Sequence, residues 1–126
     1  MTVILDAGAF VAIERGNVEV AARIKRERLA GHLPVTHGGI IGQVWRGGTG
    51  RQVGLARAIP LVKIVPLDGK LGKRAGELLA RAGSRDVIDA ALILLARDND
   101  LVITSDPGDL RALAAASGIH LEIIPV

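Results

Sequence analysis

The sequence predicts an α/β domain in which a mostly parallel sheet is covered by helices on both faces. Short β-prone apolar runs alternate along the chain with segments whose apolar residues recur at helical spacing, which is the order of repeated β-α-β units. The length of 126 residues suits one domain with a sizeable core, and 49% hydrophobic residues make the chain too apolar to be intrinsically disordered. We therefore expect a single domain over residues 1–126.

The first half of the chain contains three predicted strands. The apolar run at 3–5 ends at Asp6 and is followed by a helical pattern up to residue 12, which Gly16-Asn17 breaks. Residues 18–29 have apolar side chains on one side and charged ones on the others, which indicates an amphipathic helix. The elements expected next are a strand at 33–36, helices at 40–45 and 53–59, and a strand at 61–65.

The second half continues the alternation. Asp68 is a candidate N-cap and Gly83 a candidate stop for a helix at 71–82. Residues 86–97 are expected to form a helix that is apolar on almost every side. The remaining predicted elements are a strand at 101–104, a helix at 109–116 and a strand at 121–124.

The composition excludes several classes of protein. Without cysteine the chain has neither a disulfide framework nor a thiolate metal site. Its longest apolar run, Ala90–Ala96, is far shorter than the ~18 residues that a membrane span needs, and its start lacks the basic region of a signal peptide. We expect a cytoplasmic protein that does not associate with a membrane.

Charge is distributed unevenly along the chain, although the net charge is only +3. From Arg15 to Arg85 there are 14 basic and 4 acidic residues, whereas from Asp86 to the end there are 2 basic and 7 acidic ones. A basic middle with carboxylates gathered towards the ends suits a polyanionic substrate held beside a cation-binding centre. A solvated charged surface explains the same pattern and is the alternative.

Asp6 and Asp106 each follow a predicted strand, at the edge of the sheet where ligands of parallel sheets bind. Either carboxylate also suits a helix N-cap, and capping leaves lone pairs free for a metal. Asp89 lies in the most apolar helix, where a carboxylate needs a partner. An ion pair with Arg85 is the structural alternative for Asp89.

Five carboxylates are expected to converge if the first and fourth strands are neighbours in the sheet. They come from a strand end, the apolar helix and a second strand end, and are Asp6, Asp86, Asp89, Asp106 and Asp109. Clustered carboxylates repel one another unless a hard divalent cation neutralises them, and Mg²⁺ or Mn²⁺ prefers oxygen ligands. Beside a basic surface, such a centre predicts metal-assisted hydrolysis of a phosphodiester.

Four segments in this order resemble a PIN domain, and most closely the VapC-type toxins of bacterial toxin–antitoxin pairs. They are the strand ending in Asp6-Ala-Gly-Ala, Ile41–Gly48, Asp86–Ala91 and Val102–Leu110, and together they extend over essentially the whole chain. The resemblance implies a three-layer sandwich with a central parallel five-stranded sheet and an Mg²⁺- or Mn²⁺-dependent endoribonuclease. It also implies an RNA substrate, a homodimer and neutralisation by a cognate VapB-like antitoxin.

The same resemblance assigns roles to single residues. The catalytic, metal-binding aspartates of the family fall on Asp6, Asp89 and Asp106, with Asp86 and Asp109 as further metal ligands. Gln43 stands where the family usually has a glutamate, and both Gln43 and Ser105 are expected to support the site as polar groups. Glutamine keeps the shape and one oxygen but loses the charge. The site would then bind metal more weakly, depend on an extra carboxylate such as Asp86, or be degenerate.

The remaining surface gives weaker predictions. Trp45 is expected in the core or at a dimer interface rather than stacked on a base, and Arg46 is a candidate contact for RNA or a partner protein. The basic cluster at 23–28 is expected to be a solvated helix face. The three histidines are scattered without metal-ligand spacing and are assigned no role.

Three functions compete at this point. The leading hypothesis is a metal-dependent endoribonuclease toxin, in which an activated water attacks an RNA phosphodiester. The second is a catalytically weak PIN domain that binds RNA or its antitoxin, and Gln43 is the reason to consider it. A phosphoacceptor receiver domain has a similar length but fits poorly, because the first strand lacks paired acidic residues and no lysine follows the last strands.

Overall fold

The computed structural model describes residues 1–48 and 50–126 and confirms the predicted α/β fold. Its strands are β1 (Val3–Leu5), β2 (Val35–His37), β3 (Lys63–Val65), β4 (Leu101–Thr104) and β5 (Glu122–Pro125). They form a five-stranded sheet in the order β3-β2-β1-β4-β5, in which every neighbouring pair is parallel. β1 and β4 are therefore adjacent, as the convergence of the predicted acidic residues requires.

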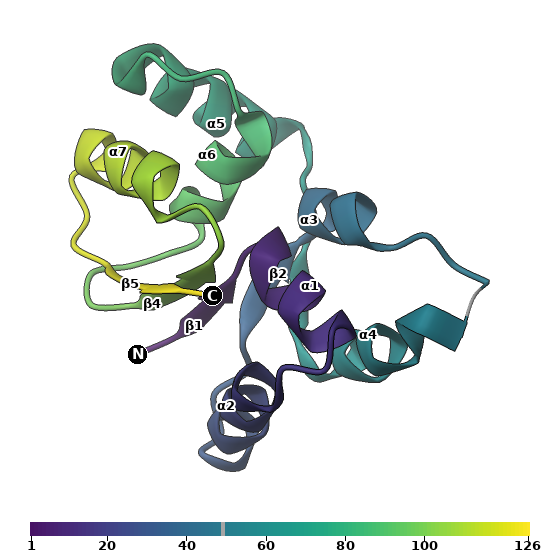
Figure 1. The fold of residues 1–126 in the computed structure, drawn as a ribbon. Helices are drawn as coiled ribbons and strands as arrows, with labels where there is room; N and C mark the ends of the chain where they lie inside the picture. Colours follow the sequence, from purple (N-terminus) through teal and green to yellow (C-terminus); the bar gives the residue numbers. More distant parts are fainter. Residues whose placement is uncertain (49) are drawn as a thin grey trace.

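The helices lie in two groups on opposite sides of the sheet (Figure 1). They are α1 (Ala7–Glu14), α2 (Val18–Leu29), α3 (Gly38–Val44), α4 (Val53–Ala58), α5 (Gly69–Ala82), α6 (Val87–Leu94) and α7 (Pro107–Ser117), with short 3₁₀ turns at Gly50–Gln52 and Ile59–Leu61. Crossovers between parallel strands are right-handed. The chain from β1 through β2 to β3 therefore places α1 to α4 on one face, and the return to β4 and β5 places α5 to α7 on the other.

The direction of the strand order reverses between β1 and β4, and these two strands are also the centre of the core. Every residue of both strands is buried. Phe10 of α1 and Leu92 and Ile93 of α6 are fully buried as well. Ligands of open parallel sheets bind at such a switch point, outside the carboxyl ends of the strands. Rigid, fully packed elements therefore carry the residues at this edge.

α6 is shorter than the helix predicted over 86–97. Its last turn tightens, since the amide groups of Leu95 and Ala96 donate to carbonyls only three residues earlier. The Asp100 carboxylate then accepts the amide of Arg97 at 2.8 Å, and Asn99 has the positive φ of 70° that turns the chain into β4. In the ranges that the structure describes, no helix has the length and apolar character to cross a membrane.

Candidate active site

Three polar residues lie level with one another where the central strands end. The register of the parallel pairs β1–β4 and β1–β2, continued to the strand ends, aligns the last residue of β4, the residue after β1 and the last residue of β2. These are Thr104, Asp6 and His37, and all three are buried. The switch point of the sheet therefore presents a hydroxyl, a carboxylate and an imidazole in one row.

Asp6 is fixed by two hydrogen bonds. Its Oδ1 accepts the amide of Ala7 at 2.7 Å, which caps α1, and its Oδ2 accepts the hydroxyl of Thr104 at 2.6 Å. The Thr104 oxygen in turn accepts the amide of Asp106 at 2.9 Å, so that the two strand ends are joined through one hydroxyl. The N-cap interpretation of Asp6 is confirmed, and each carboxylate oxygen keeps a lone pair for another partner.

Asp89 lies half-buried in the first turn of α6. Burial, followed by the negative charges of Asp6, Asp86, Asp106 and Asp109, raises the pKa of its carboxyl to about 7. The alternative of an ion pair with Arg85 is wrong: within the described residues the ion pair found joins His32 to Glu27 at 3.8 Å. Among the residues that the structure describes, Asp89 is therefore surrounded by negative charge and forms no ion pair with a cationic side chain.

The other three predicted aspartates differ in what holds them. Asp86 is the N-cap of α6, where its Oδ1 accepts the amide of Asp89 at 3.0 Å. Asp106 occupies the N-cap position of α7, but its side chain makes no capping hydrogen bond, so that part of the prediction is wrong. A hydrogen bond to the Asp106 carboxyl, together with its charge, raises the pKa of the Asp109 carboxyl. Asp106 and Asp109 thus face each other and solvent.

The chemistry of this acidic cluster suits a hard divalent cation, because neighbouring carboxylates raise the pKa values of Asp89 and Asp109 and the cluster offers oxygen ligands. In residues 1–48 and 50–126, however, no group of three His, Asp or Glu side chains stands in an arrangement that could hold a metal ion. The carboxylates of Asp86, Asp106 and Asp109 are exposed. Ligation of a metal by these carboxylates would therefore require side-chain conformations other than those in this structure.

His37 is a member of this edge that the sequence analysis left without a role. Its ring is fully buried, its Nδ1 accepts the amide of Gly39 at 3.0 Å, and its Nε2 lies 2.9 Å from the carbonyl oxygen of Ile88. An amide can only donate and a carbonyl can only accept, so the ring is the neutral tautomer with its proton on Nε2. Burial lowers the pKa of His37, against smaller raising effects from the Ile88 carbonyl and Asp6.

The sequence did contain a signal for His37. His37 stands between a predicted strand and a predicted helix, directly before Gly38-Gly39. Asp6 occupies the equivalent place between β1 and α1. The prediction ended the second strand at Thr36 and began the next helix at Ile40. The structure extends β2 to His37 and begins α3 at Gly38, which gives the histidine the N-cap position.

Two glycines allow the helices to approach the strand ends closely. A Cβ on Gly8 of α1 would lie 2.5 Å from the Oγ of Ser105 and 2.6 Å from its backbone nitrogen. A Cβ on Gly39 of α3 would lie 2.5 Å from the Cδ1 of Ile88 in α6. Ser105, predicted as a supporting polar residue, is therefore packed directly over α1 on one side. The rest of the residue is exposed to solvent.

The segment after α3 is ordered by a residue that the sequence analysis did not single out. Gln52 is buried, donates to the carbonyl of Val44 at 2.8 Å, and accepts the amide groups of Arg46 and Gly47 at 2.9 and 3.1 Å. Its side chain therefore closes the turn that carries Trp45. Trp45 is 41% exposed, so its placement in the core is wrong, whereas an interface role stays a prediction.

Gln43 and Arg46 are both exposed. The Nη1 of Arg46 donates to the carbonyl oxygens of Gly42 and Trp45 at 3.0 and 2.8 Å, which folds the side chain back over the end of α3. Gln43 lies in the last turn of α3, and in the described part of the chain no hydrogen bond links it to the acidic side chains. The structure thus does not bring Gln43 into the hydrogen-bonded cluster.

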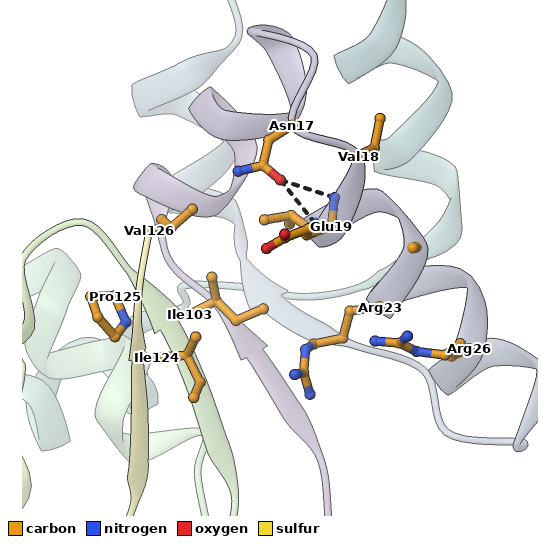
Figure 2. Close-up of a pocket in the computed structure, with 11 residues that line it drawn as sticks. Asn17, Val18, Glu19, Arg23, Arg26, Ile103, Ile124, Pro125 and Val126 are labelled. Carbon is orange, nitrogen blue, oxygen red and sulfur yellow. Dashed lines mark hydrogen bonds between the residues drawn. The ribbon is translucent and has the colours of Figure 1, made fainter.

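A cavity of about 580 Å³ lies away from these carboxylates, between the start of α2 and the ends of β4 and β5 (Figure 2). Ile103, Ile124 and Val126 contribute apolar walls, and Arg23 and Arg26 of the basic cluster lie along the other side. None of the predicted site residues lines it. The basic cluster is therefore partly a groove wall rather than only a solvated helix face.

No family model and no curated protein matches the sequence. Among solved structures, the chain is similar to one in the crystal structure of VapBC2 from Rickettsia felis bound to a DNA fragment from their promoter. The match has a TM-score of 0.71 and 14% sequence identity, and it covers 98% of this chain and 99% of that one. At this identity the likeness establishes the fold, and the chain has the PIN-like architecture that its motifs predict.

Proposed function

We propose that the protein is a metal-dependent endoribonuclease of the VapC toxin type, with its active site at the carboxyl ends of β1 and β4. The observation that carries the proposal is the Asp89 carboxyl: burial and four neighbouring carboxylates raise its pKa to about 7, and in residues 1–48 and 50–126 it forms no ion pair. A structural carboxylate is normally paired or hydrogen-bonded. Surplus charge at a topological switch point is instead what a site for a divalent cation requires.

The residues that would hold Mg²⁺ or Mn²⁺ are Asp6, Asp89 and Asp106, with Asp86 and Asp109 as additional oxygen donors. When bound, such an ion lowers the pKa of a water and neutralises charge on a phosphate. Asp6 supplies the rigid part of the site, because Thr104 and the amide of Ala7 fix its orientation. Asp106 and Asp109 supply the adjustable part, because both side chains are exposed and neither carboxylate serves as the hydrogen-bonding cap of α7.

Partners follow from the same proposal. The basic residues between Arg15 and Arg85 attract the phosphates of an RNA strand. A VapB-like antitoxin is the proposed inhibitor, which is consistent with the VapBC2 complex as a structural neighbour. The exposed indole of Trp45 favours an interface with a second copy, since large aromatic side chains are enriched at such contacts.

A second candidate is a binding module with weak or no catalysis. Gln43 favours it, because this side chain is uncharged, exposed and outside the hydrogen-bonded cluster. In this case the aspartates would retain the fold and the antitoxin-binding surface but would not support hydrolysis. Restoring the charge at position 43 separates the two candidates.

The deciding experiment is cleavage of a panel of structured RNAs by the purified, antitoxin-free protein, with Mg²⁺, Mn²⁺ or a chelator. Wild type, Asp6→Asn, Asp98→Asn and Gln43→Glu are compared. Asp98 is the matched control, because it is a carboxylate at the opposite edge of the sheet that accepts the amide of His120. Asp6→Asn is expected to lower the rate at least ~100-fold, since outer partners of metal ligands alone are worth about 10- to 100-fold.

Each outcome selects one candidate. Metal-dependent cleavage that is lost in Asp6→Asn and kept in Asp98→Asn supports the nuclease, and a lower metal requirement in Gln43→Glu identifies glutamine as a weakened ligand position. Cleavage by Gln43→Glu but not by wild type supports the binding module. Cleavage that persists in chelator or in Asp6→Asn contradicts the proposed site.

A further inference from the structure

We infer that His37 is a positioning residue of this site: it fixes the first turn of α6, and with it Asp89, against the end of β2 and the start of α3. The inference rests on the proposed function, because it concerns the same acidic site. It assigns His37 no contact with substrate or metal. Its role is to hold the element that carries Asp89 beside the row formed by Thr104, Asp6 and His37.

The ring of His37 makes two hydrogen bonds to two different helices. Nδ1 accepts the amide of Gly39 at 3.0 Å and thereby caps α3, whereas Nε2 donates to the carbonyl of Ile88 at 2.9 Å. Ile88 directly precedes Asp89 in the chain and is 51 residues from His37. One side chain therefore connects β2, α3 and α6 at the edge where the carboxylates gather.

The packing around the ring supports the same connection independently. The start of α3 is so close to α6 that a Cβ on Gly39 would lie 2.5 Å from the Cδ1 of Ile88 and 2.9 Å from the Cε1 of His37. Glycine at this position thus leaves room for the ring and for the Ile88 side chain. The contact would be lost if α6 moved outward by the width of a methyl group.

The carboxylates of the site explain why such a brace is needed. Asp6, Asp106 and Asp109 lie outside α6 and repel Asp89, which favours movement of the first turn of α6 away from the strand ends when no cation is bound. The Asp86 cap holds that turn within α6 itself, through the amide of Asp89. Among the hydrogen bonds of the described residues, the one from His37 to Ile88 ties the turn to the sheet.

Two amide side chains separate the two functions of the ring. In His37→Asn, the side-chain oxygen reproduces the acceptor position of Nδ1 and can cap α3, but the side chain is too short to reach Ile88. In His37→Gln, the terminal amide reproduces the donor position of Nε2 and can reach the Ile88 carbonyl. The matched control is Asn17→Ala, which removes the cap of α2, where Asn17 accepts the amides of Glu19 and Val20.

The first measurement is amide hydrogen exchange in the metal-free protein. The exchange rates of the Asp89 and Ala90 amides are expressed relative to the amide of Leu71 in α5. In His37→Asn this relative rate is expected to be about ten-fold or more higher than in wild type. It is expected to stay near the wild-type rate in His37→Gln and to be unchanged in Asn17→Ala. The second is a Mn²⁺ titration by electron paramagnetic resonance. There, His37→Asn is expected to weaken binding about ten-fold, with recovery in His37→Gln.

Unchanged relative exchange at Asp89 and Ala90 in His37→Asn overturns the inference, whatever the metal affinity. If His37→Asn does not fold, His37→Gln decides, because this variant keeps the side-chain donor to the Ile88 carbonyl. Fast exchange of the α6 amides in His37→Gln would contradict the positioning role, and slow exchange would support it. Failure of the proposed function looks different: wild type would then bind no Mn²⁺ and cut no RNA, while the exchange data would still decide the role of His37.

Discussion

At the amino edge of the sheet, the buried Asp100 accepts the amide of Thr2 through one oxygen and the amide of Arg97 through the other, each at 2.8 Å. At the carboxyl edge, the half-buried Asp89 has four other carboxylates as its electrostatic neighbours. The two side chains are chemically identical, and both lie beside the central strands. They differ in whether the surrounding groups are backbone donors or like charges.

This difference distinguishes a carboxylate that stabilises the fold from one whose negative charge a bound cation would neutralise. Asp100 joins the chain before β1 to the turn before β4, and backbone amides that donate to both of its oxygens stabilise its negative charge. Asp89 receives no such compensation and its pKa rises. Apolar context in the sequence therefore indicates that an acidic residue needs partners, and only the structure shows which partners it has.

The largest expected difference between the two edges is in how much each aspartate contributes to the free energy of unfolding. Asp100→Ala leaves two backbone amides without their charged acceptor and should lower the free energy of unfolding by about 3 kcal/mol. Asp106→Ala removes a carboxylate that makes no capping bond and faces Asp109, so its effect should be within about 0.5 kcal/mol. Urea denaturation of both variants at pH 7.5 in chelator measures the two values.

A smaller loss for Asp100→Ala than for Asp106→Ala would contradict the assignment of the two edges. It would mean that the carboxyl-edge aspartates are bound into the fold as tightly as Asp100, and that the repulsion among them is compensated by contacts other than those described above.

A second, smaller effect tests how closely the carboxyl edge is packed. Gly8→Ala should cost about 2 kcal/mol, because the new Cβ would lie 2.6 Å from the backbone nitrogen of Ser105, which must move. Gly76→Ala is the control in mid-α5, where nothing lies within 4 Å of the new Cβ, and it should stabilise by about 0.5–1 kcal/mol. Thermal unfolding of both variants should therefore give shifts of opposite sign, and a neutral Gly8→Ala would show that this edge can relax.

The parts of the fold that were predictable from sequence depend on local chemistry. α5 was placed to within two residues because Asp68 accepts the amide of Leu71 and Gly83 adopts the left-handed conformation, both next to the helix they delimit. The adjacency of β1 and β4 was assumed as a condition, and the strand pairing confirms it. It brings Asp6 and Thr104 into the hydrogen bond that joins the strand ends.

The parts that were missed depend on side-chain geometry that residue types and spacing do not give. His37 obtains its role from Ile88, which no spacing within the sequence indicates. The side chain of Asp106 was also suited to cap α7, but it makes no capping hydrogen bond and instead faces the carboxyl of Asp109, three residues further along the chain. Gln52 was not distinguished from any polar residue, because its three partners lie in the preceding turn.

The smallest predicted effect is the pH dependence that Asp89 adds to the metal-free protein. Its folded-state pKa of about 7 lies above the unfolded value of 3.8, so the folded state keeps a proton that the unfolded state has lost. Stability should therefore fall as the pH rises from about 4 to about 7 and then level off. Solvent screening at this half-buried site reduces the effect to about 1 kcal/mol.

Burial lowers the pKa of His37, and the protonation of this residue changes stability with the opposite sign, so the useful quantity is the difference between wild type and Asp89→Asn. Wild type should lose about 1 kcal/mol relative to Asp89→Asn between pH 4 and pH 8 in chelator, as measured by urea denaturation. Mn²⁺ at pH 8 should reverse the sign, because an ion that binds only the folded wild type stabilises it. Parallel pH profiles would place Asp89 with Asp100, as a carboxylate whose charge the fold already compensates.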